Sequence, residues 1–280
     1  MEMSPCRVVS EIAQKSKLKI GRCAPKKKGQ TMKNQHPQGE PLGRPNRYLP
    51  ALAGLLLLIT TATAAPGQVL PPDSHAFGKT YAEWLVSWWQ WSLSFPVSAD
   101  PEFGTADLSA NQSGRVWFLP APLGGATATR SGNIPAGTAL FVPVLTLEAD
   151  NTGCPTYTDF SAEQLAGLAQ GGWSFATATS CTIDGVPVPG MDNPQTTPYL
   201  VQTPPFSYTV ASQDNVLANY PGFVNETCIP DGIKVFPTVA QGVCVLIAPL
   251  PVGPHKIHIA ASVPAFGIAY DVTFVINVVP

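Results

Sequence analysis

The sequence has few charged residues, and they are unevenly distributed. Charged side chains make up 12% of the 280 residues, and the formal net charge is −2. Of the 16 Lys and Arg, 11 lie within residues 1–64, together with 3 of the 18 Asp and Glu. Residues 65–280 therefore hold 5 basic and 15 acidic side chains, a net charge of −10. A chain this acidic has no basic patch for phosphate groups, so we expect no nucleic-acid binding.

Long apolar runs are also missing, with one exception. Residues 49–59 read LPALAGLLLLI, after Arg44 and Arg47 and before the sequence Ala-Thr-Ala at 62–64. This pattern is typical of a secretory signal peptide with a cleavage site between small residues. We expect cleavage after Ala64, cleavage one residue later being less favoured, and an uncleaved anchor is the alternative. The run is shorter than the roughly 20 apolar residues of a membrane-spanning helix, so we expect no stable membrane span after cleavage.

The signal begins unusually far from the first residue. Residues 1–31 are basic and lack an apolar period, and Met32 followed by Lys33 has the form of a signal-peptide start. We therefore expect residues 1–31 to be an extension before the true start, and residues 32–64 to be the signal peptide. Residues 65–280 then form a single domain, large enough for a core of its own. The predicted location is extracytoplasmic, either secreted or periplasmic.

Four of the six cysteines follow the signal peptide, at Cys154, Cys181, Cys228 and Cys244. An even number in an exported protein favours disulfides. Three pairings are possible, and we favour Cys154–Cys181 with Cys228–Cys244 because both close local loops. Buried free thiols are the alternative. The sequence has no zinc-type spacing of Cys and His.

Helical periodicity is rare after residue 95, whereas glycine and proline are abundant. Short apolar runs separated by turn residues are typical of a β-sandwich. Asp184-Gly185 between two β-prone runs predicts a hairpin, and Pro143 predicts an edge position or a bulge. We expect strands at residues 115–119, 138–146, 206–210, 242–250, 255–263 and 270–279.

Residues 80–95 read TYAEWLVSWWQWSLSF and predict an amphipathic helix. Thr80 and Glu83 have the spacing of a capping box, and Pro96 disfavours helix before it. Three of the four tryptophans repeat at i, i+4 and i+7 on one face, whereas Trp89 lies beside this stripe. We expect these rings to pack as core against a sheet, with a carbohydrate-binding platform as the alternative. Trp89 is the ring that we retain as a candidate ligand contact.

A mainly β fold follows from these patterns. We predict an Ig-like or jelly-roll-type β-sandwich, with the amphipathic helix packed on it near the start of the domain. One short extra helix is expected at residues 162–169, between the cap Ser161 and a stop at Gly171-Gly172.

The two histidines near the C-terminus lie three residues apart on a predicted strand. In Ig-like domains a tyrosine at this place bonds back to the preceding turn, and we expect His255 to make that bond. His258 then faces the opposite side of the strand, exposed or beside a cleft.

Common catalytic motifs are absent, including G-x-S-x-G, H-E-x-x-H and the phosphate-binding loop. Carboxylates gather at Glu148, Asp150 and Asp159. Oxygen ligands at close spacing can hold Ca²⁺, and paired carboxylates can serve glycoside hydrolysis. We expect a polar loop without a metal or cofactor, and a calcium site at these three residues is the alternative.

Five stretches together resemble a group of uncharacterised exported bacterial proteins. They read YAEWLVSWWQWSLSFP, VWFLP, IPAGTALFVPVL, CTIDGVPV and PVGPHKIHIAA. The resemblance spans nearly all of residues 65–280. It implies export and the β-sandwich with its Trp-rich helix, and it carries no catalytic residues.

We therefore expect a secreted, extracytoplasmic binding or envelope-associated module without catalytic activity. Its expected partner is a glycan or another component of the cell envelope. The alternative is a secreted hydrolase that acts on a polysaccharide or similar polymer through paired carboxylates. The candidate site residues are Trp89, Trp117, Trp173, His258, Glu148 and Asp150.

Overall fold

The computed structural model describes residues 68–102, 107–120, 127–152, 158–219 and 229–280. These residues all belong to one compact unit. The expected extension at 1–31 and the expected signal peptide at 32–64 lie outside the described residues. In the described part of the chain, no helix is long and apolar enough to cross a membrane.

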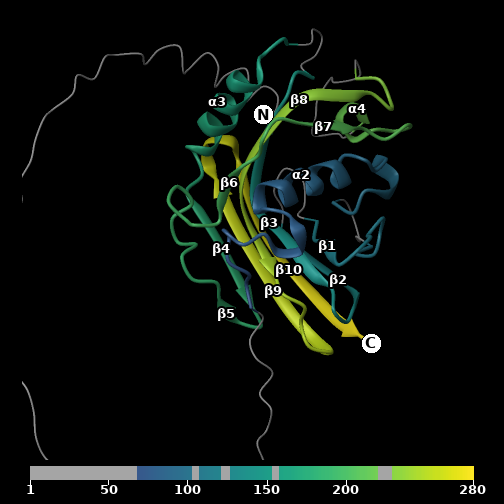
Figure 1. Ribbon diagram of the computed structural model, residues 1–280, viewed down its shortest axis with the longest axis vertical. Coiled ribbons are helices and arrows are strands. Elements are labelled where there is room, and N and C mark those ends of the chain that lie inside the picture. Colours follow the sequence, from purple (N-terminus) through teal and green to yellow (C-terminus); the bar gives the residue numbers. More distant parts are fainter. Residues whose placement is uncertain (1–67, 103–106, 121–126, 153–157, 220–228) are drawn as a thin grey trace, which may run out of the picture. The chain divides into compact units, whose positions relative to one another are not determined.

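Two mixed sheets form the body of the protein (Figure 1). The first has the order β1 (Val116–Phe118), β3 (Ala139–Ala149), β8 (Lys234–Ile247) and β6 (Leu200–Gln202), and β7 (Phe206–Thr209) also pairs with β8. The second has the order β2 (Thr127–Pro135), β10 (Ile268–Val279), β9 (Gly253–Val263), β4 (Ala178–Ile183) and β5 (Val186–Pro187). The pairs β1–β3 and β2–β10 are parallel, and the other described pairs are antiparallel.

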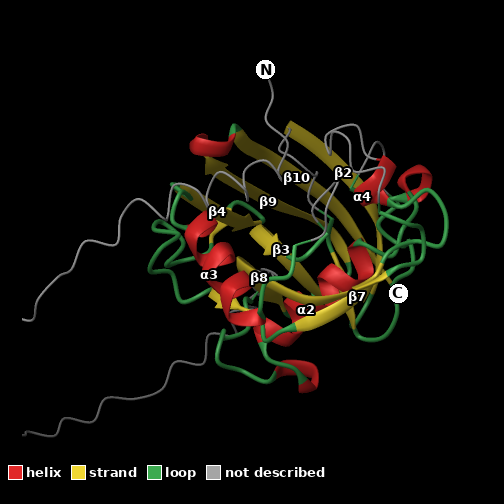
Figure 2. Ribbon diagram, turned by 90° about the horizontal axis from the view of Figure 1, so that it is seen from above, coloured by secondary structure: helices red, strands yellow, loops and turns green. Residues whose placement is uncertain are grey.

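Two helices pack on opposite faces of the first sheet. They are α2 (Tyr81–Ser92) and α3 (Ala162–Trp173), and the short α4 (Val216–Asn219) follows β7. Trp89 of α2 bonds Thr146 on β3, whereas α3 packs against Ala149 of the same strand. Side chains three residues apart on a strand point to opposite faces. Figure 2 shows α2 on the side of the first sheet that is remote from the second sheet.

The burial of the strands follows from these layers. On β10, Val272, Phe274, Ile276 and Val278 are buried, and the residues between them are partly or fully exposed. This alternation was predicted and is confirmed. β3 and β8 instead have long runs of consecutive buried residues, because packed elements cover both faces of their sheet. The predicted mainly β sandwich, with a helix packed on it and one extra helix, is confirmed.

The helix α3 is longer than predicted. It continues through Gly171 and Gly172 and ends at Trp173. The Trp173 side chain is fully buried, and its indole N–H donates to the Pro194 carbonyl oxygen at 3.1 Å. Two helical glycines cost about 1 kcal/mol each, and burial of a large ring outweighs this cost. The prediction that the two glycines stop the helix was therefore wrong.

Three strand details also differ from the prediction. Pro143 lies at a β-bulge, as one predicted alternative had it, but β3 is a central strand of its sheet. β8 begins at Lys234, eight residues before the predicted start at 242. β2 was not predicted, because residues 127–135 read TATRSGNIP and lack apolar alternation.

The two described cysteines carry free thiols. Cys181 and Cys244 are both buried in the core, where they pack as small apolar side chains. Burial raises the pKa of Cys181 to about 12. The structure does not contain the predicted disulfides at these two residues, and the predicted partners Cys154 and Cys228 lie outside the described residues.

Candidate functional site

The helix α2 begins at a complete capping box. The Glu83 amide donates to the Thr80 hydroxyl at 3.2 Å, and the Thr80 amide donates to the Glu83 carboxylate at 2.7 Å. These two bonds satisfy N–H groups that have no partner within the helix. The predicted start of the helix is confirmed, and it ends at Ser92, a few residues before Pro96.

All four tryptophans of α2 are core residues. Each is at most 9% exposed, and each indole N–H has a partner in the protein. Three donate to carbonyl oxygens at 3.1–3.2 Å. Trp89 donates to the Thr146 hydroxyl at 3.2 Å and meets the Trp88 ring edge-on at 5.1 Å. The predicted core role is confirmed, and Trp89 has no open face for a ligand.

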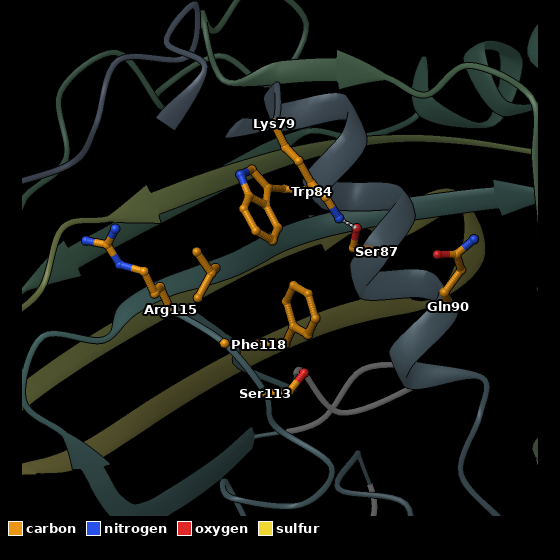
Figure 3. Close-up of a pocket in the computed structure, with 9 residues that line it drawn as sticks. Lys79, Trp84, Ser87, Gln90, Ser113, Arg115 and Phe118 are labelled. Carbon is orange, nitrogen blue, oxygen red and sulfur yellow. Dashed lines mark hydrogen bonds between the residues drawn. The ribbon is translucent and has the colours of Figure 1, made fainter. Parts of the chain in front are cut away.

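A pocket of about 360 Å³ lies between the solvent side of α2 and β1 (Figure 3). Residues 113–116 and Phe118 line it on one side, and residues of α2 and its cap line the other. The α2 side is formed by Lys79, Trp84, Ser87 and Gln90. Its volume lies at the lower end of the range for small-molecule sites.

Two aromatic rings, together with Val116, form the apolar part of this pocket. Trp84 and Phe118 meet edge to face, with their ring centroids 6.3 Å apart. The Trp84 indole N–H donates to the Ala76 carbonyl oxygen at 3.1 Å, so the ring is fixed by the segment before the helix. This arrangement gives the pocket a rigid apolar wall beneath its polar rim.

Two cations flank these rings. The Lys79 ammonium donates to the Ser87 hydroxyl at 2.7 Å and lies 4.8 Å from the Trp84 ring. The Arg115 guanidinium lies 5.1 Å from the Phe77 ring. Both are favourable cation–π arrangements. Within the described residues, neither cation lies within 4 Å of a carboxylate.

Of the remaining described lining residues, three have uncharged hydrogen-bonding side chains, and the fourth is Gly114. Ser87 and Ser113 contribute hydroxyls, and Gln90 contributes an amide whose nitrogen donates to the Ser207 carbonyl oxygen at 2.8 Å. Glu83 does not line the pocket, and its carboxylate accepts hydrogen bonds from the amide and the hydroxyl of Thr80. Those bonds lower the pKa of Glu83, with smaller contributions from His75 and Lys79. The pocket therefore has a cationic and neutral polar lining.

The sequence-predicted site residues do not converge on this pocket. Trp117 is half-buried on β1, between the lining residues Val116 and Phe118. Trp173 is buried on α3, and Trp89 is on the buried side of α2. His258 is partly exposed on β9, where its Nε2 lies 2.8 Å from the Asp271 carboxylate. The prediction that His258 faces away from His255 is confirmed.

Glu148 and Asp150 lie together near the end of β3, around Tyr208. The Asp150 carboxylate accepts hydrogen bonds from the Tyr208 hydroxyl and from the amide and hydroxyl of Thr152, the latter two at 2.8 and 2.7 Å. Burial raises the pKa of Tyr208, and both carboxylates raise it further. Asp159 is exposed, and the described residues contain no group of three or more potential ligands for a metal ion. The carboxylate of Asp150 therefore serves as a hydrogen-bond acceptor within the fold.

A second acid pair was missed by the sequence reading. Asp100 and Glu102 are buried next to Ser92 and Arg130. The Ser92 hydroxyl donates to the Glu102 carboxylate at 2.8 Å, and the Glu102 amide donates to the Asp100 carboxylate at 2.8 Å. Burial raises the pKa of Glu102 to about 8 and that of Asp100 to about 6, and the Asp100 charge adds to the shift at Glu102. Asp100 and Glu102 are two residues apart in the sequence, but only the folded chain buries them and places them beside Ser92 and Arg130.

The turn before β9 is held as predicted. His255 Nε2 lies 2.8 Å from the Pro251 carbonyl oxygen, and its Nδ1 lies 2.8 Å from the Asp184 carboxylate. The same carboxylate accepts a bond from the Lys256 amide at 2.8 Å. Asp184 and Gly185 have φ of 51° and 81° and connect β4 to β5, so the predicted hairpin is confirmed.

No protein-family profile and no curated protein matches the sequence. Among solved structures, the chain is similar to PbICP-C in its complex with falcipain-2, at 12% identity over 59% of this chain and 100% of that one, with a TM-score of 0.22. It is also similar to amebosin, at 15% identity over 55% of this chain and 96% of that one, with a TM-score of 0.16. Likenesses this weak carry no argument about fold or function.

Proposed function

We propose that the protein is an extracytoplasmic binding module, secreted or envelope-associated and without catalytic activity. Its ligand is a glycan or another sugar-like component of the cell envelope, bound in the pocket between α2 and β1. The observation that carries the proposal is the lining of this pocket. Aromatic rings at its base and hydroxyl, amide and cationic groups around it are the groups that bind a hydroxylated ring.

The exported location is part of the same proposal. It rests on the signal-peptide pattern before Ala64 and on the resemblance to exported bacterial proteins. The net charge of −10 over residues 65–280 supports a ligand other than nucleic acid.

The hydrolase alternative has weaker support. The expected pair, Glu148 and Asp150, surrounds the buried hydroxyl of Tyr208, and Asp150 already accepts three hydrogen bonds. The acids Asp100 and Glu102 are buried as well. Neither pair lines the pocket between α2 and β1.

The proposal is tested by blocking the pocket. The purified protein is screened against an array of neutral and acidic oligosaccharides, and each hit is measured by calorimetry. Ser113 and Ser180 are both exposed serines, and Ser113 lines the pocket whereas Ser180 lies on β4. We expect Ser113→Trp to weaken binding at least tenfold and Ser180→Trp to leave it unchanged. No binding to any oligosaccharide, or equal binding by both variants, would contradict the proposal.

A further inference from the structure

We infer that the sugar held in this pocket carries a negatively charged group, and that Lys79 and Arg115 recognise this charge. The inference rests on the proposed function, because it specifies the chemistry of the ligand at the same site.

The distribution of charge is the first support. Residues 65–280 have only five Lys and Arg, and two of these five line the pocket. Arg130 is buried, and the other two, Lys234 and Lys256, are exposed on β8 and β9. None of the described residues that line the pocket is acidic. It is therefore a local concentration of positive charge in a part of the chain whose net charge is −10.

Both cations keep donor groups for a ligand. An ammonium group has three N–H donors, and Lys79 uses one on the Ser87 hydroxyl. A guanidinium has five donors, and no hydrogen bond from the Arg115 side chain to another described residue is found. Charge-assisted hydrogen bonds from such groups to an anion are about twice as strong as neutral ones.

The two cations are also held in place before a ligand arrives. Lys79 is fixed between the Ser87 hydroxyl and the Trp84 ring, and Arg115 rests on Phe77. Figure 3 shows Arg115 and the Lys79 ammonium on opposite sides of the Trp84 ring. A sugar ring lying against Trp84 and Phe118 can therefore direct an acidic substituent to a cation on either side. Groups that are already positioned lose less entropy on binding.

The test compares charged sugars with neutral ones of the same size. The probes are oligosaccharides of glucuronate and galacturonate beside their methyl esters, and sulfated oligosaccharides beside their unsulfated parents. We expect the purified protein to bind at least one charged probe at least tenfold more tightly than its neutral counterpart. The double variant Lys79→Gln/Arg115→Gln should lose this preference, and the matched control Lys234→Gln/Lys256→Gln should retain it.

The outcomes separate this inference from the proposed function. Equal affinity for charged and neutral probes, with binding still blocked by Ser113→Trp, would overturn the charge inference and leave the proposed function standing. A preference for charged probes that survives Lys79→Gln/Arg115→Gln would overturn the assignment of these two residues. If no probe of either kind binds, both the inference and the proposed function fail. Binding of a carboxylated or of a sulfated probe alone would support the inference and identify the charged group.

Discussion

The two sides of α2 differ in how their polar groups are used. On the buried side, Trp88, Trp89 and Trp91 donate every indole N–H to an acceptor within the protein. On the solvent side, Lys79 and Gln90 border a pocket and keep donor groups beyond their internal bonds. Interior polar groups must be paired because leaving one unpaired costs about 1–3 kcal/mol. Polar groups on the solvent side escape this penalty and are available to a ligand.

Trp84 belongs to both sides of the helix. It is 9% exposed, so its ring is mostly core, but one part of it lines the pocket beside Phe118. The fold and the candidate site therefore share Trp84, and they also share Val116, which is 4% exposed and lines the pocket. Substitutions on the buried side of α2 should change stability, and substitutions on its solvent side should change binding, so the two effects can be measured separately.

The largest expected effect is on the buried side. Trp88→Ala removes a ring that is 3% exposed and a hydrogen bond to the Leu119 carbonyl oxygen. We expect the free energy of unfolding to fall by about 3–5 kcal/mol, measured by urea denaturation. Gln90→Ala, on the exposed side of the same helix, should cost no more than about 1.5 kcal/mol. Equal losses in the two variants would contradict the contrast between the two sides.

A pH-dependent effect is expected where the buried end of α2 meets Glu102. The native pKa of about 8 exceeds the ordinary value of 4.5, mainly because of burial. The native state therefore retains a proton that the unfolded chain loses, and stability falls as the pH rises from 4.5 to about 8. One such group changes the unfolding free energy by at most about 1.4 kcal/mol per pH unit.

Glu102→Gln should remove most of this slope, because the neutral amide still accepts the Ser92 hydroxyl bond. Exposed Glu163 on α3 provides the control, and Glu163→Gln should leave the slope unchanged. Denaturation curves at pH 5, 6, 7 and 8 measure the effect. Parallel pH profiles for Glu102→Gln and the parent protein would show that burial does not hold a proton on Glu102.

The same contrast between inside and outside is found on β9. His255 is buried and contacts two acceptors, whereas His258 is partly exposed and contacts the exposed Asp271. We expect His255→Ala to lower the unfolding free energy by about 1–3 kcal/mol, because it removes a buried ring together with its contacts to Asp184 and Pro251. His258→Ala should cost about 0–1 kcal/mol. If thermal melts showed a larger loss of stability for His258→Ala than for His255→Ala, the assignment of His255 to the buried face and of His258 to the exposed face would be wrong.

The smallest expected effect is at the start of α2. Thr80→Ala removes the cap that accepts the Glu83 amide, and it should cost about 1 kcal/mol. Thr80→Ser keeps a hydroxyl and should restore most of the loss. Because Thr80 adjoins Lys79, oligosaccharide binding is measured on both variants. Unchanged stability of Thr80→Ala would show that the capping box contributes nothing measurable.

Local patterns predicted the elements whose stability depends on local chemistry. Residue spacing predicted four features: the capping box at Thr80, the hairpin at Asp184-Gly185, the alternation on β10 and the bond from His255 to the preceding turn. Each depends on residues that lie close together in the chain or repeat at a regular interval. The amphipathic character of α2 was also apparent from helical periodicity.

Features that depend on residues far apart in the sequence could not be predicted from it. The pocket forms because residues 113–118 lie along a helix that ended about 20 residues earlier, and no periodicity predicts that contact. The buried cluster of Asp100, Glu102 and Arg130 has the same cause. One signal was available: after residue 64, cations are so scarce that Lys79 and Arg115, each near tryptophans, merited attention.

Indole N–H resonances provide the most direct test of the central claim that the ligand lies in the pocket between α2 and β1. The protein has six tryptophans, all within the described residues, and of these six only Trp84 lines this pocket. Two-dimensional NMR during titration with the tightest oligosaccharide should shift one indole peak strongly, and Trp84→Phe should identify that peak by its loss. A strong shift confined to Trp117, Trp173 or Trp89, with the Trp84 peak unmoved, would contradict the account.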